Sequence, residues 1–366
     1  MSTADQPLSG IRVVDFSSLI PGPLATLMLQ EAGADVIRIT RPDGDPMAKL
    51  PPYVGGVNAE HIVLTAGKDC FAADLRNASD LEQVRKIIAT ADVLVEGFRP
   101  GVMGKYGLGY EDLKTTHPKL IYCSITGYGQ NGPNRSKAGH DINYQAESGL
   151  LAMSPGTVET PSVPPALVAD IAGGSFASVI NILLALLKRE KTGQGSHLDI
   201  AMADGATTLL IQAQARRQAT GADPCPRGEM LTGGSPRYDL YATKDGRFLA
   251  VGAIEEKFWE AFCATVGLPL TATSDQVRAI VLQETSETWE KRFEGVDACV
   301  SLVSTLSEAM ESNHAKHRSL YTRKVEGPDG IQLDALPLPI SQVFRHPSGR
   351  IPEYSTASLY SEETIS

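Results

Sequence analysis

The sequence has few cysteines, and those present form no recognisable pattern. The five, Cys70, Cys123, Cys225, Cys263 and Cys299, are an odd number and include neither a C-x-x-C pair nor a metal-ligand spacing. This argues against a disulfide framework and against a zinc site. We therefore expect reduced, mostly buried thiols and no bound metal.

Long apolar runs are also lacking. The longest, residues 176–187, is too short to cross a bilayer and is interrupted by Ser178 and Asn181. Residues 1–10 show no charged region followed by an apolar one, as a secretory signal would. The sequence thus predicts a cytoplasmic protein that has no membrane partner.

Positive charge is in deficit. The 33 Lys and Arg residues face 43 Asp and Glu residues, which gives a formal net charge of -10. Nucleic acid is therefore excluded as a bulk electrostatic partner. Any anionic ligand must be held by a local cluster of cations.

What is present is an ordinary globular composition, with 42% hydrophobic and 21% charged residues. At roughly 150 residues per domain, the 366 residues suggest about two domains. The first part alternates short apolar runs with helical segments. We predict strands at 11–16, 35–39, 92–95, 120–125 and 196–200, and helices at 24–32, 80–89, 170–188 and 201–217. Such alternation predicts a parallel sheet covered by helices on both faces, with a ligand cleft at the carboxyl ends of the strands.

The pattern of predicted secondary structure changes after a Pro/Gly-rich segment at 221–236. A hairpin signal surrounds Asp245 and Gly246, and helical segments are predicted at 256–266, 275–293 and 300–311. We therefore expect an α/β protein with a large Rossmann-like domain over 1–220 and a smaller α+β domain over 221–330. The tail, 331–366, is expected to return to the large domain.

Residues 127–132, Gly-Tyr-Gly-Gln-Asn-Gly, match G-x-G-x-x-G after a predicted strand. No helix signal follows, and no acidic residue ends a second strand about 20 positions later, as a dinucleotide site requires. A ligand-carrying turn at the end of a strand is the better interpretation.

The informative residues form two blocks, 138–146 and 166–174. Histidine is the side chain whose ordinary pKa lies near neutrality, so His140 could both abstract and return a proton, and Asp141 beside it could orient the imidazole. Asp170 stands just before a helix, where backbone amides stabilise a carboxylate. From the pattern alone, a plain helix cap at Asp170 and an ordinary loop histidine at His140 are the favoured interpretations, so the pattern by itself does not settle the function.

Several blocks together resemble the family III CoA-transferases, also called the CaiB/BaiF family. They are residues 8–16, 21–23, 31–38, 95–101, 108–110, 139–146 and the Asp170 block. The resemblance covers Leu8 to about Gly267, and within the family it is greatest to a racemase branch that acts on 2-methylacyl-CoA thioesters. Gly139 to Tyr144 and Val251 to Glu255 carry that finer match.

The resemblance implies a mechanism. His140 and Asp170 would face opposite sides of the α-carbon, one removing the proton to give an enolate and the other reprotonating it. Asp141 and Glu255 would be supporting acids, and backbone N–H groups at the glycine-rich helix start, which includes Gly173, would stabilise the enolate oxygen. No metal or redox cofactor is implied, because the CoA thioester is itself the substrate.

The resemblance also implies the binding residues. Arg38, Lys68 and Arg99 would contact the CoA phosphates, at or after strand ends, and Gly139 and Tyr144 would line the thioester end of the pocket. Family members form an interlaced homodimer whose active site lies between the large domain of one subunit and the small domain of the other.

Two alternatives remain open at the level of sequence. In a true CoA-transferase, Asp170 would attack an acyl-CoA to form a mixed anhydride. The second alternative is a protein that binds acyl-CoA without converting it. Residues 65–70, Thr-Ala-Gly-Lys-Asp-Cys, also depart from the family's more basic stretch, because Asp69 replaces a cation.

Overall fold

The computed structural model describes residues 6–153, 156, 160, 162–345 and 352–354. It divides into two compact units. The first contains Met1–Ser148, Ala166–Thr208 and Lys316–Ser366, and the second contains Gly149–Pro165 and Leu209–Ala315. The predicted small domain, 221–330, differs from the second unit at both ends. One physical reason is that Val325 packs against Ile62 and Ala66 of the first unit.

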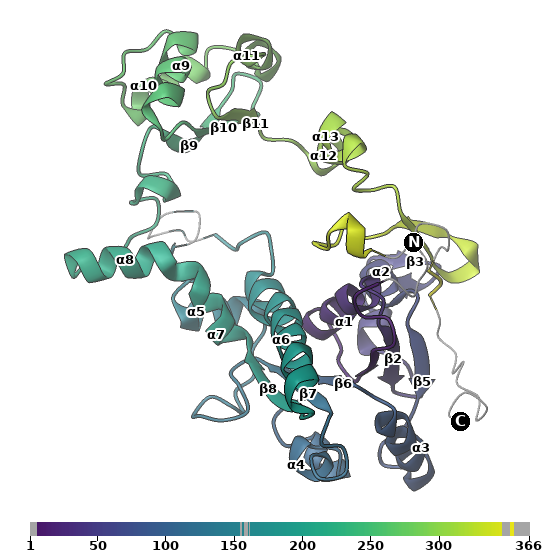
Figure 1. Ribbon diagram of the computed structural model, residues 1–366. Helices are drawn as coiled ribbons and strands as arrows, with labels where there is room; N and C mark the ends of the chain where they lie inside the picture. The colour runs from purple at the N-terminus through teal and green to yellow at the C-terminus, as the bar shows by residue number, and fades with distance from the viewer. Residues whose placement is uncertain (1–5, 154–155, 157–159, 161, 346–351, 355–366) are drawn as a thin grey trace. The chain divides into compact units, whose positions relative to one another are not determined.

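The first unit is built on a six-stranded parallel sheet, which confirms the predicted fold class (Figure 1). The order is β5-β2-β1-β6-β7-β8, which becomes 3-2-1-4-5-6 when the strands are renumbered along the chain. Its strands are β1 (Arg12–Asp15), β2 (Asp35–Thr40), β5 (Asp69–Ala72), β6 (Val93–Glu96), β7 (Ile121–Thr126) and β8 (Ser196–Ala201). The strand order reverses between β1 and β6, and ligands bind beside such a switch point.

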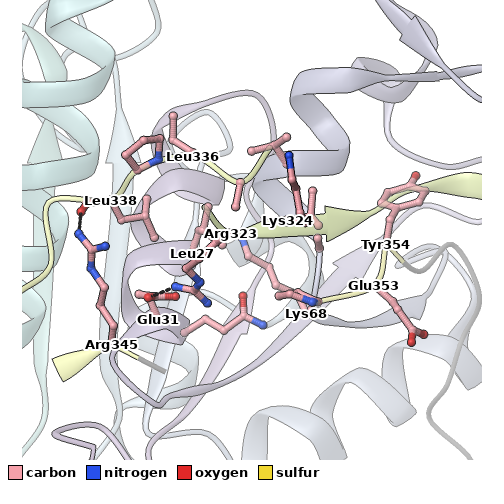
Figure 2. Close-up of a pocket in the computed structure, with 18 of the residues that line it drawn as sticks. Leu27, Glu31, Lys68, Arg323, Lys324, Leu336, Leu338, Arg345, Glu353 and Tyr354 are labelled. Carbon is pink, nitrogen blue, oxygen red and sulfur yellow. Dashed lines mark hydrogen bonds and ion pairs between the residues drawn. The ribbon is translucent and has the colours of Figure 1, made fainter. Parts of the chain in front are cut away.

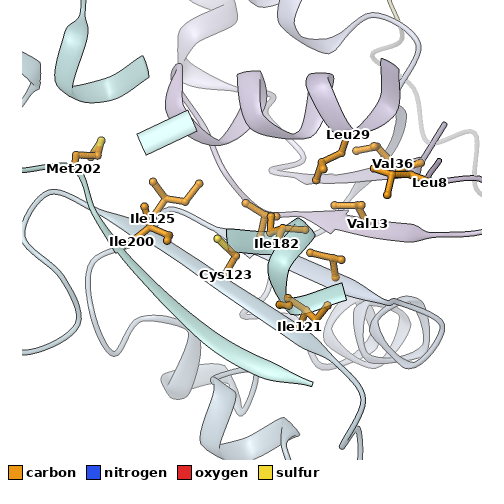
Figure 3. Close-up of a cluster of buried hydrophobic side chains, with 14 of the residues drawn as sticks. Leu8, Val13, Leu29, Val36, Ile121, Cys123, Ile125, Ile182, Ile200 and Met202 are labelled. Carbon is orange, nitrogen blue, oxygen red and sulfur yellow. The ribbon is translucent and has the colours of Figure 1, made fainter. Parts of the chain in front are cut away.

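Helices cover both faces of this sheet. Consecutive strand residues point to opposite faces, so each face carries apolar side chains that a helix can cover. Val93 and Val95 of β6 join one core cluster with Leu29 and Ile182. Figure 3 labels Leu29 and Ile182 among the side chains of this cluster. Leu94 joins the other cluster, on the opposite face. The helices of the first unit are α1 (Pro21–Glu31), α2 (Ala59–Thr65), α3 (Ala78–Ala89), α4 (Tyr110–Leu113), α5 (Asp141–Ser148), α6 (Ala177–Thr192) and α7 (Met202–Thr207).

The helical run predicted at 170–188 is a π-helix, η5 (Ala169–Phe176), continued by α6. Together they span Ala169–Thr192, which by length and composition alone could cross a membrane and is longer than the apolar stretch 176–187. Ile182 and Ala185 pack in the core beside the sheet, which accounts for part of this apolar character.

Gly173 permits η5 to lie directly against α7. A Cβ at Gly173 would come 2.4 Å from the Met202 carbonyl oxygen, and one at Gly205 would come 2.5 Å from the Gly173 Cα. Both contacts are with backbone, which cannot move aside cheaply. The small residues of this segment therefore serve a close helix–helix contact.

The described C-terminal residues belong to the first unit and pack against its helices α1 and α2. β12 (Lys324–Glu326) pairs with β13 (Gln332–Asp334), and Leu338 packs among Leu24, Met28 and Leu64. A short hairpin, β3 (Tyr53–Val54) with β4 (Val57–Asn58), precedes α2. The predicted return of 331–366 also involves 346–351 and 355–366, which lie outside the described residues.

The second unit has its own antiparallel sheet, of order β11-β10-β9, around a core that includes Trp259, Phe262 and Trp289. Its elements are α8 (Ile211–Thr220), β9 (Tyr238–Ala242), β10 (Phe248–Gly252), α9 (Glu256–Val266), α10 (Ser274–Val281), α11 (Ser286–Phe293), β11 (Val300–Leu302) and α12 (Leu306–Glu311), after which α13 (Asn313–His317) leads back to the first unit. The single helix predicted at 300–311 is wrong at its start, because Val300–Leu302 pair with β10 as an edge strand. The helix predicted at 275–293 is two helices.

Candidate active site

A cavity of about 350 Å³ lies within the first unit, where β1, β6 and β7 end. Ser17 and Ser18 come from the end of β1, residues 97–100 follow β6, and residues 126–128 close β7. This is the switch point of the sheet, as the sequence predicted for a ligand cleft. The loop at 127–132 is a turn with no helix after it, so the dinucleotide interpretation is not supported by its context.

His140, Gly139, Tyr144, Asp170 and Arg99 all line this cavity. The sequence motifs predict all five as site residues, although the most distant pair, Arg99 and Asp170, are 71 residues apart in the chain. The fold brings these five together. Their catalytic and binding roles remain predictions.

His140 is held at the start of α5 by its own backbone. Its N–H donates to the Asn143 Oδ1 at 3.0 Å, and its carbonyl oxygen accepts from the Asn143 N–H at 2.8 Å. This reciprocal arrangement satisfies groups that a helix start leaves free. The imidazole is therefore presented from a fixed backbone, and the residue is exposed at the cavity.

Gly139 and Tyr144 form one wall. The Tyr144 hydroxyl donates to the Gly139 carbonyl oxygen at 2.5 Å, and a Cβ at Gly139 would come 2.8 Å from the Tyr144 ring. A Cβ at Gly127 would come within 2.5 Å of the same ring. Both glycines are thus required by the buried tyrosine between them.

The carboxyl group of Asp170 has a pKa close to neutral pH. Burial first, and the negative charge of Asp141 second, raise the pKa of Asp170 to about 7. Asp170 lies within the first turn of η5, one residue past Ala169, and Val168 occupies the cap position. The plain helix-cap interpretation of Asp170 therefore does not hold.

Asp141 performs that capping instead. Its Oδ1 accepts from the backbone N–H groups of Ala169 and Asp170 at 2.8 and 3.0 Å, and its Oδ2 accepts from the Gln145 side chain at 2.5 Å. The residue is only 4% exposed and does not line the cavity. Asp141 thus ties α5 to η5, and by this tie it fixes Asp170 relative to His140.

Replacing Asp141 by Asn is expected to lower the pKa of Asp170, because Asn keeps an acceptor for the two N–H groups but removes the negative charge. The ionised form of Asp170 then persists to lower pH, so the limb of the pH–rate profile that reports Asp170 should move to lower pH. The measurement is kcat/KM against pH, with the exposed Glu190→Gln on α6 as the matched control. An unmoved limb would show that Asp141 does not act on Asp170 electrostatically.

Three cations face the cavity: Arg99, Arg135 and Lys137. The Lys137 Nζ lies 2.7 Å from the Glu147 Oε1 and 5.9 Å from the centre of the Tyr128 ring. Neither Arg135 nor Lys137 is predicted from the sequence motifs. The available signal was their position in the loop that links β7 to the His140 block.

Arg38 and Lys68 do not line this cavity among the residues described. The Arg38 Nη2 lies 3.3 Å from the Asp45 Oδ2, and the residue is 5% exposed. Lys68 precedes β5 rather than following a strand, which corrects its predicted place. The strand was missed because Asp69–Ala72 is only four residues long.

The Lys68 side chain is completely buried. Its Nζ donates to the Pro23 carbonyl oxygen and to the Thr26 Oγ1, both at 2.7 Å, and lies 3.7 Å from the Asp15 Oδ2. Burial lowers the pKa of Lys68 to about 7, against the opposing effect of Asp15. In this structure the Lys68 amine therefore ties α1 to the end of β1. Lys68 also contributes to the lining of the second cavity described below, and its contact with CoA phosphate stays a prediction.

The two remaining predicted residues lie elsewhere. Glu255 is exposed in the second unit, at the cap position of α9. Gly173 is buried against α7 and does not line the cavity, so its packing contact, not an oxyanion contact, is what the structure displays. Among the described residues no group of three His, Cys, Asp or Glu side chains could hold a metal ion.

A second cavity of the first unit, about 400 Å³, lies between α1, α2 and the C-terminal residues (Figure 2). Lys68, predicted from the sequence to bind CoA, lines this cavity with Arg323, Lys324 and Arg345. All four are engaged: Lys68 as described above, Arg323 with Glu31, Lys324 with Asp334, and the Arg345 guanidinium with the carbonyl oxygens of Leu338 and Ile340, to which it donates. It contains none of the acid–base residues predicted from the sequence.

Comparison with known proteins fits this arrangement. The model of CoA-transferase family III matches residues 8–355. The chain belongs to family III of the CoA-transferases. It is 35% identical to the alpha-methylacyl-CoA racemase of Mus musculus, with 98% of this chain and 91% of that protein covered.

Transferases of family III are nearly as similar. The succinate–glutarate CoA-transferase of Agrobacterium fabrum is 32% identical, with 100% of this chain and 98% of that protein covered. A crystal structure of a CaiB/BaiF family protein from Brucella suis superposes with a TM-score of 0.80 at 28% identity, covering 92% of each chain. Family membership thus establishes an enzyme fold that handles acyl-CoA, and leaves the reaction to be decided by the site.

Proposed function

We propose that the protein is a racemase that interconverts (R)- and (S)-2-methylacyl-CoA thioesters, with His140 and Asp170 as the acid–base pair. The observation that carries this is the presence of both side chains in one cavity, with the pKa of Asp170 raised to about 7. Racemisation needs two such groups. A single base that returned its proton to the same face would only regenerate the starting enantiomer.

The chemistry of Asp170 favours this reaction over acyl transfer. An acid–base catalyst works best when its pKa lies near the working pH, because both its protonated and ionised forms are then available. A nucleophilic carboxylate must be ionised, and a pKa of about 7 leaves much of it protonated at neutral pH. Burial of Asp170 therefore suits it to proton transfer at neutral pH.

The surroundings of the pair suit a CoA thioester. Arg99 and Arg135 supply cations to a protein of net charge -10, so an anion can be held locally, and Lys137 adds a third cation that is paired with Glu147. Apolar and aromatic groups on the same walls, Leu19, Phe98 and Met202, suit an acyl chain. The CoA thioester is itself the substrate, and we propose no metal or redox cofactor.

The test is to offer the enzyme an (S)-2-methylacyl-CoA together with a ¹³C-labelled free acid. The proposal predicts appearance of the (R)-thioester and no labelled thioester. Labelled thioester, with hydroxylamine-sensitive modification of Asp170 and no inversion, would instead identify a CoA-transferase. Binding without either product would identify a silent acyl-CoA-binding protein.

We further propose that the enzyme acts as an interlaced homodimer, in which Glu255 reaches the cavity of the other subunit and assists His140. Support comes from α6, where Ile180, Leu183, Leu184 and Leu187 follow the i, i+3, i+4, i+7 spacing of one helix face and are 40–62% exposed. An apolar face of this kind is typical of a surface that another chain covers.

Light scattering is expected to give the mass of two chains for the wild type and of one chain for the double variant Leu184→Lys, Leu187→Lys. A matched control is Leu306→Lys, which changes an exposed leucine of α12. A monomeric wild-type protein with full activity would contradict the proposed dimer.

A further inference from the structure

A buried carboxyl group lies directly behind the wall of the cavity. Glu96 is the last residue of β6, and 4% of it is exposed. Its Oε2 accepts the backbone N–H of Phe98 at 2.8 Å. Phe98 and Arg99 line the cavity, so this hydrogen bond fixes the turn that carries Arg99.

Glu96 belongs to a polar chain that crosses the sheet. It is paired in register with Ser124 of β7 and hydrogen-bonds the Ser124 side chain. The Ser124 Oγ lies 3.2 Å from the Nε2 of His197 on β8. His197 is exposed, and its ring stacks on the Tyr110 ring at 4.7 Å between centroids.

A serine hydroxyl can donate in only one direction at a time. With Glu96 ionised, Ser124 donates to the carboxylate and accepts from His197. With Glu96 protonated, the direction reverses and Ser124 can donate to a neutral His197. The chain can therefore adopt either charge state of Glu96 without losing a hydrogen bond within it, and the bond that changes in strength is the one to Phe98.

The other titratable groups near Glu96 are acidic. Asp199 on β8 lies in register with Ser124, and Tyr122 and Cys123 of β7 interact with the Glu96 charge. Farther along, on α4, Asp112 acts on Tyr122 and Glu111 acts on His197.

Burial is the main cause that raises the pKa of Glu96 to about 7, and Asp199 adds to it. The hydrogen bonds from Ser124 and Phe98 act in the opposite direction.

We propose that Glu96 is a positioning residue for the CoA-binding wall: its carboxylate holds the 97–99 turn through the Phe98 N–H, and its protonation loosens that turn and the placement of Arg99. This inference rests on the proposed function only in requiring that the cavity bind CoA. It holds equally for a racemase and for a transferase.

The sign of the pH dependence follows. Above its pKa Glu96 is ionised, and a charge-assisted N–H···O⁻ bond is roughly twice as strong as a neutral one. Lowering the pH from 8 to 6 protonates Glu96 and weakens that bond. Affinity for CoA is therefore expected to fall by about three- to tenfold over this range from Glu96 alone.

The first test is calorimetric titration with free CoA at pH 6 and pH 8. Glu96→Gln keeps an acceptor for Phe98 but cannot ionise, so its affinity at pH 8 should fall toward the wild-type value at pH 6. The matched control is Glu60→Gln on α2, whose carboxyl pKa is also raised by burial and which does not line the cavity. Wild-type affinity of Glu96→Gln at both pH values would overturn the proposal.

The second test needs no CoA, so a failure of the proposed function cannot obscure it. Selective ¹⁵N-phenylalanine labelling gives at most nine backbone amide signals. The Phe98 signal, assigned with Phe98→Tyr, should titrate near pH 7 in the wild type. Ser124→Ala removes a hydrogen bond that lowers the pKa of Glu96, so it should move this midpoint to higher pH.

A Phe98 signal that does not move between pH 5.5 and 8.5 would refute the role of Glu96 even if CoA binding proved pH-dependent. This holds also if Glu96→Gln fails to fold, because the wild-type titration alone gives the answer.

Discussion

Asp170→Asn is expected to lose racemisation by about 10²- to 10⁴-fold, the usual contribution of a positioned acid–base group. Asn resembles Asp in size and can keep its place at the start of η5, so the loss would reflect the missing proton donor and acceptor. The initial rate of inversion of a chiral 2-methylacyl-CoA measures it. His140→Ala should show a loss of similar size.

The two variants should differ in what they retain. Each leaves one base, which can still exchange the α-proton of one enantiomer with solvent deuterium without inverting it. Asp170→Asn and His140→Ala are therefore expected to exchange opposite enantiomers. Asp204→Asn, at an exposed position on α7, is the control for the loss of a carboxylate outside the proposed pair. More than a tenth of wild-type racemisation in Asp170→Asn would remove Asp170 from the proposed pair.

Lys68→Met is expected to lower the free energy of unfolding by about 1–3 kcal/mol at pH 8, because buried hydrogen-bonding groups lose a partner. The groups that lose a donor are the Pro23 carbonyl oxygen and the Thr26 hydroxyl oxygen. The Thr26 hydroxyl still donates to Asp15, whose Oδ2 lies 3.7 Å from the Lys68 Nζ. Denaturant unfolding measures the difference. The exposed Lys86→Met on α3 is the matched control.

The pH dependence of this effect has a definite sign. The pKa of Lys68 falls from 10.5 to about 7 on folding, so between these values the unfolded chain binds a proton that the folded chain does not. The contribution of Lys68 to stability therefore rises with pH above 7 and is lost toward pH 6. The difference between wild type and Lys68→Met should shrink as the pH is lowered. A variant of normal stability that binds CoA poorly would instead return Lys68 to the phosphate-binding role predicted from sequence.

The sheet could be predicted because its strands are buried on both faces. Residues 93–95 are apolar without interruption, and such runs need no knowledge of their partners to be recognised as strands. β5 was missed because Asp69–Ala72 is short and begins with a charge. The helix predicted at 300–311 failed where three residues paired as an edge strand, which depends on β10 about 50 positions earlier.

The candidate site shows the same limit. His140 and Asp170 could be named from their motifs, but the capping of Ala169 by Asp141 joins residues 28 positions apart and has no local signature. Lys68 is held by Pro23 and Thr26, at separations of 45 and 42. Its burial could not be foreseen from a lysine that precedes an unrecognised strand.

The most direct test of the central claim is incubation of a single enantiomer of a 2-methylacyl-CoA with the enzyme in deuterium oxide. The account predicts that the opposite enantiomer forms with deuterium at the α-carbon, from either starting enantiomer. Recovery of the starting enantiomer with its α-proton intact would contradict it.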